Sequence, residues 1–247
     1  MFSRFIRSMA IFLLSGWLAL GSGNAGTWSF PGAADLSAAK DSPAWVASLD
    51  EAQQTGQLFI VAVTSGSKAE ITMHQKDADG VWKQILSTTG NVGRNGLGKT
   101  REGDGKTPTG VFRFNSAFGI GEDPGCPMGY YRVTADDWWS GDQREGYGYN
   151  TMVSVTRLPD LDRSASEHII DNTRAYQYCL SISYNEACVP GLGSAIFLHG
   201  PNGNSFASSG CVVIPRNAML TVMRNVTWEC VVIIDTRANI QARAQGN

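Results

Sequence analysis

The sequence predicts a mainly β domain of the β-rich α+β class with a few short helices. Three observations support this prediction: short β-branched and aromatic runs recur along the chain, helical periodicities are few, and 28 glycines interrupt polar connecting segments. An apolar content of 43% in 247 residues is enough to build a sizeable core.

The first 25 residues have the features of a secretory signal peptide. Arg4 and Arg7 form a basic region, the apolar stretch 9–20 follows, and Gly23-Asn24-Ala25 supplies small residues for cleavage. An uncleaved membrane anchor is the alternative, but an apolar run of about 12 residues falls short of the roughly 20 that span a bilayer. We therefore expect a secreted protein of the periplasm or cell envelope, with no stable membrane insertion after cleavage.

Two further segments follow the signal peptide. Residues 26–55 are expected to form an N-terminal helical extension, with Ser42 as N-cap, Pro43 at the first helical position and the helix reaching about Gln54. Residues 56–247 are expected to form one catalytic domain. A net charge of −2 without a basic run argues against nucleic acid as the main partner, and the oligomeric state stays open.

Strands are expected along most of this domain. The first three form an antiparallel meander, because Asp79-Gly80 is a hairpin turn signal. The helix after Pro215 has an apolar face at helical spacing. The expected strands are 57–63, 69–74, 81–86, 110–114, 151–156, 176–184, 194–199 and 230–235, and the helix face is Ala218, Met219, Val222, Met223 and Val226.

Two long segments between the expected strands could shape a binding cleft. Residues 90–110 are rich in glycine, but they lack the GxxxxGK[ST] spacing of a phosphate-binding loop, so a shaped surface loop beside a cleft is favoured. Residues 115–150 are dense in aromatic residues and glycine. Long ordered loops in compact domains are usually functional.

The five cysteines of an exported chain leave one thiol unpaired if the others form disulfides. Cys126, Cys179, Cys188 and Cys230 allow three connectivities. Pairing the sequence neighbours Cys179 and Cys188 would leave Cys126 with Cys230. Cys211 is then expected to be the single free thiol.

The strongest chemical signal joins His199 to Cys211. A buried-type strand ends at His199-Gly200, and Ser208-Ser209-Gly210-Cys211 follows before another apolar run. At the ends of adjacent strands, the imidazole could take the thiol proton and its positive charge would lower the thiol pKa. Small residues before the cysteine leave backbone N–H groups free for an oxyanion. A structural cysteine with a strand-end histidine is the alternative.

This stretch resembles the catalytic segment of the L,D-transpeptidase family, whose motif is His-Gly, a variable loop, then Ser/Thr-X-Gly-Cys and an apolar pair. Residues 93–96 and 102–112 look like the family's "EGD-x-KTPxGxF" block. Residues 133–139, 166–168, 184–185 and 190–199 match an envelope-associated branch, so the resemblance spans roughly residues 58–235.

The resemblance implies an L,D-transpeptidase-like β-sandwich and a role for each motif residue. Cys211 would be the nucleophile, His199 the general base, the Gly200 carbonyl the group that orients the imidazole, and the Gly210 and Cys211 N–H groups the oxyanion donors. The family attacks the position-3 carbonyl of peptidoglycan stem peptides, releases D-Ala and passes the thioester to an amine; carbapenems inhibit it. Neither a cofactor nor a metal is implied.

Two positions depart from the better-known motif. Ser209 stands where many members have histidine, which leaves His199 as the only imidazole near the nucleophile. Val213 stands where many members have arginine, which could bind a carboxylate of the substrate. Without it, the choice of acyl acceptor stays open.

Substrate-binding candidates have structural alternatives. Ser209 adjoins the nucleophile; Arg94 and Lys99 could meet stem carboxylates or lie on a solvated loop. Trp138, Trp139, Tyr147 and Asn150 could line a peptide cleft or pack the core. His74 and His168 are expected to be structural or at the surface, and no zinc-ligand spacing is present.

Other enzyme classes fit the sequence less well. Papain-like enzymes have the cysteine before the histidine, and caspase-like enzymes separate histidine and cysteine by about 50 residues. Two alternatives stay open: a hydrolase of the same bonds (an L,D-carboxypeptidase or amidase), and a wall-binding module that has lost turnover.

Overall fold

The computed structural model describes residues 32–246, so the signal peptide expected over residues 1–25 lies outside the described residues. In the described part, ten strands form one sheet in the order β1-β4-β12-β11-β10-β5-β13-β2-β3, with β6 added beside β5. Because β3 also pairs with β4, this sheet closes on itself around a core. The predicted mainly β class is confirmed.

The strands of this closed sheet have the following bounds. They are β1 (Lys40–Asp41), β2 (Gln57–Ser65), β3 (Lys68–Lys76), β4 (Trp82–Asn91), β5 (Gly110–Gly119), β6 (Tyr131–Arg132), β10 (Cys179–Ile182), β11 (Phe197–His199), β12 (Val212–Val213) and β13 (Val231–Thr236).

Strand β2 is buried on both faces, which explains its continuous apolar sequence. Phe59 and Val61 face the main core cluster, whereas Leu58 and Ile60 face a second cluster beneath the short helices. A strand covered on both sides reads as an unbroken apolar run rather than an alternation. The predicted meander is confirmed, since β3 pairs antiparallel with both β2 and β4, and β13 adds to β2 in parallel.

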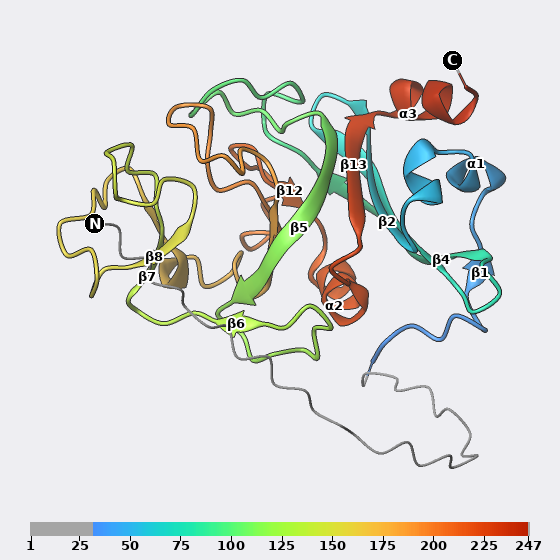
Figure 1. Ribbon diagram of the computed structural model, residues 1–247, viewed down its shortest axis with the longest axis horizontal. Coiled ribbons are helices and arrows are strands. Elements are labelled where there is room, and N and C mark those ends of the chain that lie inside the picture. The colour runs from blue at the N-terminus through green and yellow to red at the C-terminus, as the bar shows by residue number, and fades with distance from the viewer. Residues whose placement is uncertain (1–31, 247) are drawn as a thin grey trace, which may run out of the picture.

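The helices cover opposite sides of this sheet. Helix α2 (Arg216–Asn225) follows Pro215 as predicted and buries its apolar face in the main cluster. Helix α3 (Arg237–Ala244) was not predicted; it packs beside α1 at the right of Figure 1. No helix in residues 32–246 is long and apolar enough to cross a membrane.

The single helix expected from Ser42 to about Gln54 is wrong. The segment forms α1 (Ala44–Ala47) and a 3-10 turn, η1 (Asp50–Gln53), because Leu49 has an extended backbone between them. Ser42 does not cap α1: its hydroxyl is hydrogen-bonded to His74 Nδ1 at 2.8 Å. The segment nevertheless packs on the closed sheet, since β1 pairs with β4.

A separate three-stranded sheet, hereafter the small sheet, forms the other end of the molecule (Figure 1). It consists of β7 (Asp137–Trp139), β8 (Met152–Ser154) and β9 (Glu167–His168), with the 3-10 turn η2 (Ile169–Asp171) directly after β9. Strand β7 lies inside the segment 115–150 that the sequence left without strands. Strand β8 is shorter than the expected 151–156, because residues 155–157 turn away.

The expected disulfides are wrong, since all five cysteines are free thiols. Cys179 is buried on β10, whereas Cys188 lies in a partly exposed turn where its thiol donates to the Glu186 carbonyl. Cys126 and Cys230 both lie in the main core cluster without a bond between them. The odd number of cysteines therefore does not distinguish Cys211 from the other four. Its position in a cleft with His199 does.

Candidate active site

Parallel pairing of β11 with β12 brings His199 and Cys211 to one cleft. Leu198 lies opposite Val212 and His199 opposite Val213, so Cys211 enters the sheet beside Phe197. Cys211 and His199 are only 7% and 6% exposed, and both line a cleft of about 300 Å³. Part of the remaining wall comes from the small sheet and from the glycine-rich segment 90–110, and the rest comes from residues 172–176, 194–196 and 202–210.

The thiol of Cys211 is held by two backbone groups. It donates to the Ala195 carbonyl at 3.2 Å and accepts from the Phe197 N–H at 3.4 Å. Ala195 has a φ of 55°, a left-handed conformation that costs a non-glycine residue about 1–3 kcal/mol. This turn also explains why β11 begins at Phe197 rather than at the expected residue 194.

The resting thiol is neutral, in contrast to the activated thiolate that the sequence suggested. Burial raises the pKa of Cys211 to about 12, and the negative charge of Glu167 adds to the effect. Burial also lowers the pKa of His199 to about 4, against the influence of the Gly200 carbonyl. Neither charged form is favoured when the two groups are this deeply buried, so the two side chains rest as thiol and neutral imidazole.

The hydrogen bond of His199 defines its tautomer. Its Nδ1 lies 2.6 Å from the Gly200 carbonyl oxygen, which can only accept, so Nδ1 carries the proton. The lone pair is therefore on Nε2. The ring of Tyr176 packs edge-on against the imidazole, with the ring centroids 5.1 Å apart. The Gly200 carbonyl thus holds the imidazole through Nδ1.

The peptide before Cys211 is fixed by a buried threonine. Thr107 Oγ1 donates to the Gly210 carbonyl at 2.6 Å and accepts from the Gly93 N–H at 2.8 Å. Because the C=O and N–H of a trans peptide point in opposite directions, the Cys211 N–H is turned away from Thr107. The Gly210 N–H instead points to Ser208 Oγ at 3.4 Å. Cys211 is therefore the better oxyanion donor of the two.

Gly210 is required by space as well as by conformation. Its φ is 154°, and a Cβ there would lie 2.8 Å from both Ile196 Cδ1 and the Lys106 carbonyl oxygen. Such contacts are shorter than a Cβ tolerates. A side chain at this position would move Cys211.

Neither basic candidate is free to meet a stem carboxylate in the cleft. Lys99 lines the cleft, but its Nζ forms an ion pair with Asp104 at 3.0 Å. Burial alone would raise the pKa of Asp104, but N–H groups of Thr100 and Lys106, together with Lys99, hold it well below its usual range. Arg94 lies outside the cleft lining and donates to Ser209 Oγ at 2.7 Å.

Of the aromatic candidates, only Trp139 lines the cleft. Its indole N–H donates to Asn150 Oδ1, which also accepts from the Ala195 N–H, so Asn150 joins the small sheet to the thiol's partner. Trp138 points away and stacks on His168 at 4.3 Å. Tyr147 lies against Arg144 and donates to Asp160, outside the cleft.

The two other histidines have structural partners. His74 is buried between Ser42 and Thr72, and burial lowers its pKa to about 4. His168 lies between Asp171 and the Ala135 carbonyl. Within residues 32–246, no group of three or more metal-ligating side chains is close enough to hold a metal ion.

Three cleft residues were not identified from the sequence: Glu102, Glu167 and Tyr176. Glu102 and Glu167 fall within the quoted family-like segments, but nothing in those segments indicated a role. Tyr176 donates to Glu167 Oε2 at 2.7 Å, and its ring is the one that packs on His199. Only the fold joins these residues, because they lie far from Cys211 in the sequence.

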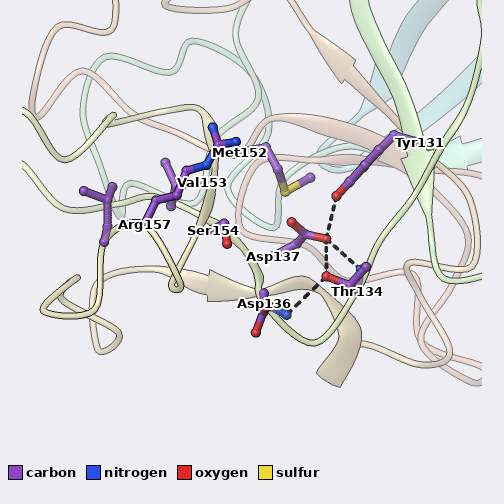
Figure 2. A pocket seen from close by; sticks show the side chains of 9 residues that line it. Tyr131, Thr134, Asp136, Asp137, Met152, Val153, Ser154 and Arg157 are labelled. Atoms are coloured by element: carbon purple, nitrogen blue, oxygen red, sulfur yellow. Dashed lines mark hydrogen bonds between the residues drawn. The ribbon is translucent and has the colours of Figure 1, made fainter.

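A larger hollow of about 780 Å³ lies elsewhere, beside β7 and β8 of the small sheet. Figure 2 shows that the carboxylate of Asp137 points toward Tyr131 and Thr134 rather than into open space. Asp137 Oδ2 accepts from the Tyr131 hydroxyl at 3.0 Å and from both the N–H and the hydroxyl of Thr134. These bonds serve the fold, and neither Cys211 nor His199 lines the hollow.

The fold and the cleft define the class of protein: a strand-rich domain whose buried cysteine and histidine lie in one cleft, an arrangement suited to thiol chemistry. Residues 67–234 match the family model of the L,D-transpeptidase catalytic domain, and the chain belongs to this family. Its activity is accordingly of the L,D-transpeptidase type, directed at peptidoglycan. No match is found among the curated proteins.

Proposed function

We propose that the chain is a cysteine-dependent acyltransferase that attacks the position-3 carbonyl of a peptidoglycan stem peptide and releases D-Ala. The observation that carries this proposal is the thiol of Cys211 in one cleft with an imidazole whose Nε2 lone pair is free. The family match supports the substrate class.

The neutral resting pair gives His199 the role of general base during the attack. As the Cys211 sulfur bonds to the carbonyl carbon, Nε2 takes the thiol proton, and the oxyanion is stabilised by the Cys211 N–H. The imidazolium then gives its proton to the amine of D-Ala as the C–N bond breaks. The thioester and the leaving amine remain, and the imidazole is neutral again.

The second half of the reaction passes the acyl group to an amine. Hydrolysis by water, as in an L,D-carboxypeptidase or amidase, and loss of turnover in a wall-binding module are the competing outcomes. We also propose that the protein acts in the periplasm or cell envelope, on the strength of residues 1–25. N-terminal sequencing of the protein recovered from the envelope tests that location.

Mass spectrometry of purified muropeptides tests the reaction directly. Incubation should release D-Ala and give a cross-linked dimer, with an enzyme thioester on Cys211 visible in the intact mass. Cys211→Ala should give none of these products. Products that form equally with Cys211→Ala would contradict the proposal.

A further inference from the structure

The cleft around Cys211 is acidic. The carboxyls of Glu102 and Glu167 line it, and neither has an ion-pair partner within residues 32–246. The one lysine in the lining, Lys99, is neutralised by Asp104. A cleft with this charge balance attracts a cation rather than a carboxylate.

Glu167 is connected to His199 through one intervening side chain, that of Tyr176. Strand β9 pairs with β7, which sets Glu167 opposite Trp139 in the wall of the cleft. Glu167 Oε2 accepts from the Tyr176 hydroxyl, and the ring of Tyr176 contacts the ring of His199. Burial raises the pKa of Glu167 and the charge of Glu102 adds to this, so Glu167 is a stronger base than an exposed carboxylate.

Glu102 has a different position and a fuller set of partners. Its Oε2 accepts from the Tyr149 hydroxyl at 2.6 Å and from Ser194 Oγ at 2.9 Å. The Tyr149 hydroxyl also accepts from the Gly193 N–H at 3.1 Å. Glu102 therefore fixes the turn that leads into β11. Of the two carboxylates, Glu167 is the one linked to His199 through Tyr176, and its charge is the one that acts on Cys211.

We propose that Glu167 binds the ammonium group of the acyl acceptor and holds it beside His199. The acceptor is then a primary amine that is charged in solution, such as the side-chain amine of a diamino acid in a second stem peptide. This inference rests on the proposed function, because it concerns the second half of that reaction.

The proton balance of this step uses both side chains. The ammonium loses one proton to the Glu167 carboxylate and attacks the thioester carbon as a neutral amine. His199 Nε2 takes a second proton from the new C–N nitrogen. The C–S bond then breaks, and the imidazolium returns that proton to the Cys211 sulfur. The products are an amide and the resting thiol, and Glu167 releases its proton to water.

The test separates the two half-reactions in Glu167→Gln. A stem tetrapeptide serves as donor, and a stem tripeptide whose third residue is a diamino acid with a free side-chain amine serves as acceptor. Glutamine keeps the size and still accepts from Tyr176. Its thioester should form measurably, but the ratio of amide product to hydrolysis product should fall at least tenfold. Glu167→Asp should recover part of the ratio.

An uncharged nucleophile isolates the role of the carboxylate. Hydroxylamine is neutral at pH 7 and has no ammonium to bind or deprotonate. It should therefore capture the thioester of Glu167→Gln at close to the wild-type rate. Glu145→Gln, an exposed residue outside the cleft, is the matched control and should leave the product ratio unchanged.

Several outcomes would overturn the inference, and they can be told apart. An unchanged ratio in Glu167→Gln, or an equal fall in Glu102→Gln, would show that Glu167 has no specific role. Loss of thioester formation in Glu167→Gln would assign Glu167 to the first half-reaction. A wild type that forms the thioester but makes no amide overturns only this inference, whereas a wild type that forms no thioester overturns the proposed function as well.

Discussion

The closed sheet and the small sheet are held together in different ways. Strands β3 and β4 pair over nine residue positions, and their apolar side chains pack in the main core cluster. Strands β7 and β9 pair over only two positions. The small sheet packs Trp139 against Phe118 and Phe197 of the closed sheet, and polar side chains bonded to backbone groups hold the loops around it. Asp137 holds Thr134, Asp142 holds the Arg144 and Asp162 N–H groups, and Asn150 holds Ala195.

We expect this difference to separate the residues that act on the reacting bond from those that bind the substrates. Cys211, His199 and the Thr107–Gly210 contact belong to the closed sheet and its adjoining loop, where backbone geometry is fixed by the core. Trp139 and Glu167 reach the cleft from the small sheet. Substitutions in the first region should therefore act on kcat, and substitutions in the second on KM and on the choice of acceptor.

The largest effect is expected from His199→Ala. Loss of the general base should slow acylation of Cys211 by about 10²–10⁴-fold, because the neutral thiol then loses the group that takes its proton during attack. Stem-peptide affinity should change little, since the walls of the cleft stay in place. Carbapenem acylation followed by intact mass measures the rate. His168→Ala, in the small sheet, is the control; an equal loss there would mean that the wrong base was chosen.

Acid should destabilise the closed sheet through its buried histidines. The folded pKa of His74 and of His199 is lowered to about 4, so the unfolded chain binds more protons below its pKa of about 6.5. The free energy of unfolding should therefore decrease as pH falls from about 6.5 to 4, by up to about 3 kcal/mol for each histidine. Urea unfolding across this range measures it.

The aspartate of the Lys99 pair adds a second loss at lower pH. The folded pKa of Asp104 is depressed, so its contribution is complete above the unfolded value of about 3.9 and is lost as pH falls below that. Asp104→Asn should reduce the loss of stability below pH 4, to which Asp142 also contributes through its lowered pKa, but leave the slope between 6.5 and 4. A single steep loss confined to pH below 4 in the wild type would contradict the histidine assignment.

Asn150→Ala tests whether the small sheet holds the cleft wall. The substitution removes hydrogen bonds to Trp139, Ala195 and the Tyr184 carbonyl, and should cost about 1–3 kcal/mol of stability. Alanine at this position also strains the backbone, because the φ of residue 150 is 58°. Asn150→Gly removes the same hydrogen bonds without that strain, so comparing the two variants separates the two effects. Thermal unfolding and KM are the readouts. A fall in kcat alone would break the proposed division between the regions.

Thr107→Val should produce a smaller loss of rate from within the closed sheet. Valine keeps the shape of threonine but cannot hold the Gly210 carbonyl, so the Cys211 N–H is no longer oriented toward the oxyanion. We expect kcat to fall about tenfold, less than the 10²–10³ typical of removing a donor outright, with KM unchanged. Thr107→Ser should restore most of the rate. A change in KM without a change in kcat would contradict this role.

The two regions also differed in how well the sequence predicted them. Apolar periodicity was sufficient for β2, β3, α2 and β13, because packing against one core imposes it. It failed for β7 and β9, which are two or three residues long and are stabilised by side chains such as Asp137 and Asn150. The turn at Ala195 was missed for a similar reason. Its N–H donates to the side chain of Asn150 and its carbonyl accepts from the Cys211 thiol, and both partners are distant in sequence.

The candidate site was predictable where it is local in sequence. The His199-Gly200 and Gly210-Cys211 pairs were identified from spacing and family resemblance, and the closed sheet brings them together. The charge states were not predictable, because burial, not the neighbouring imidazole, dominates the pKa of Cys211. Glu167 and Tyr176 were missed since no local pattern joins them to a cysteine more than 30 residues further along.

We infer that Cys211 rests as a neutral thiol and loses its proton only during attack. The rate of Cys211 alkylation by iodoacetamide, followed by peptide mass spectrometry from pH 6 to 10, tests it directly. A pKa raised to about 12 predicts a rate that keeps rising across the whole range, in the wild type and in His199→Ala alike. A plateau with an inflection below pH 7 that disappears in His199→Ala would reveal a resting thiolate–imidazolium pair and contradict the account.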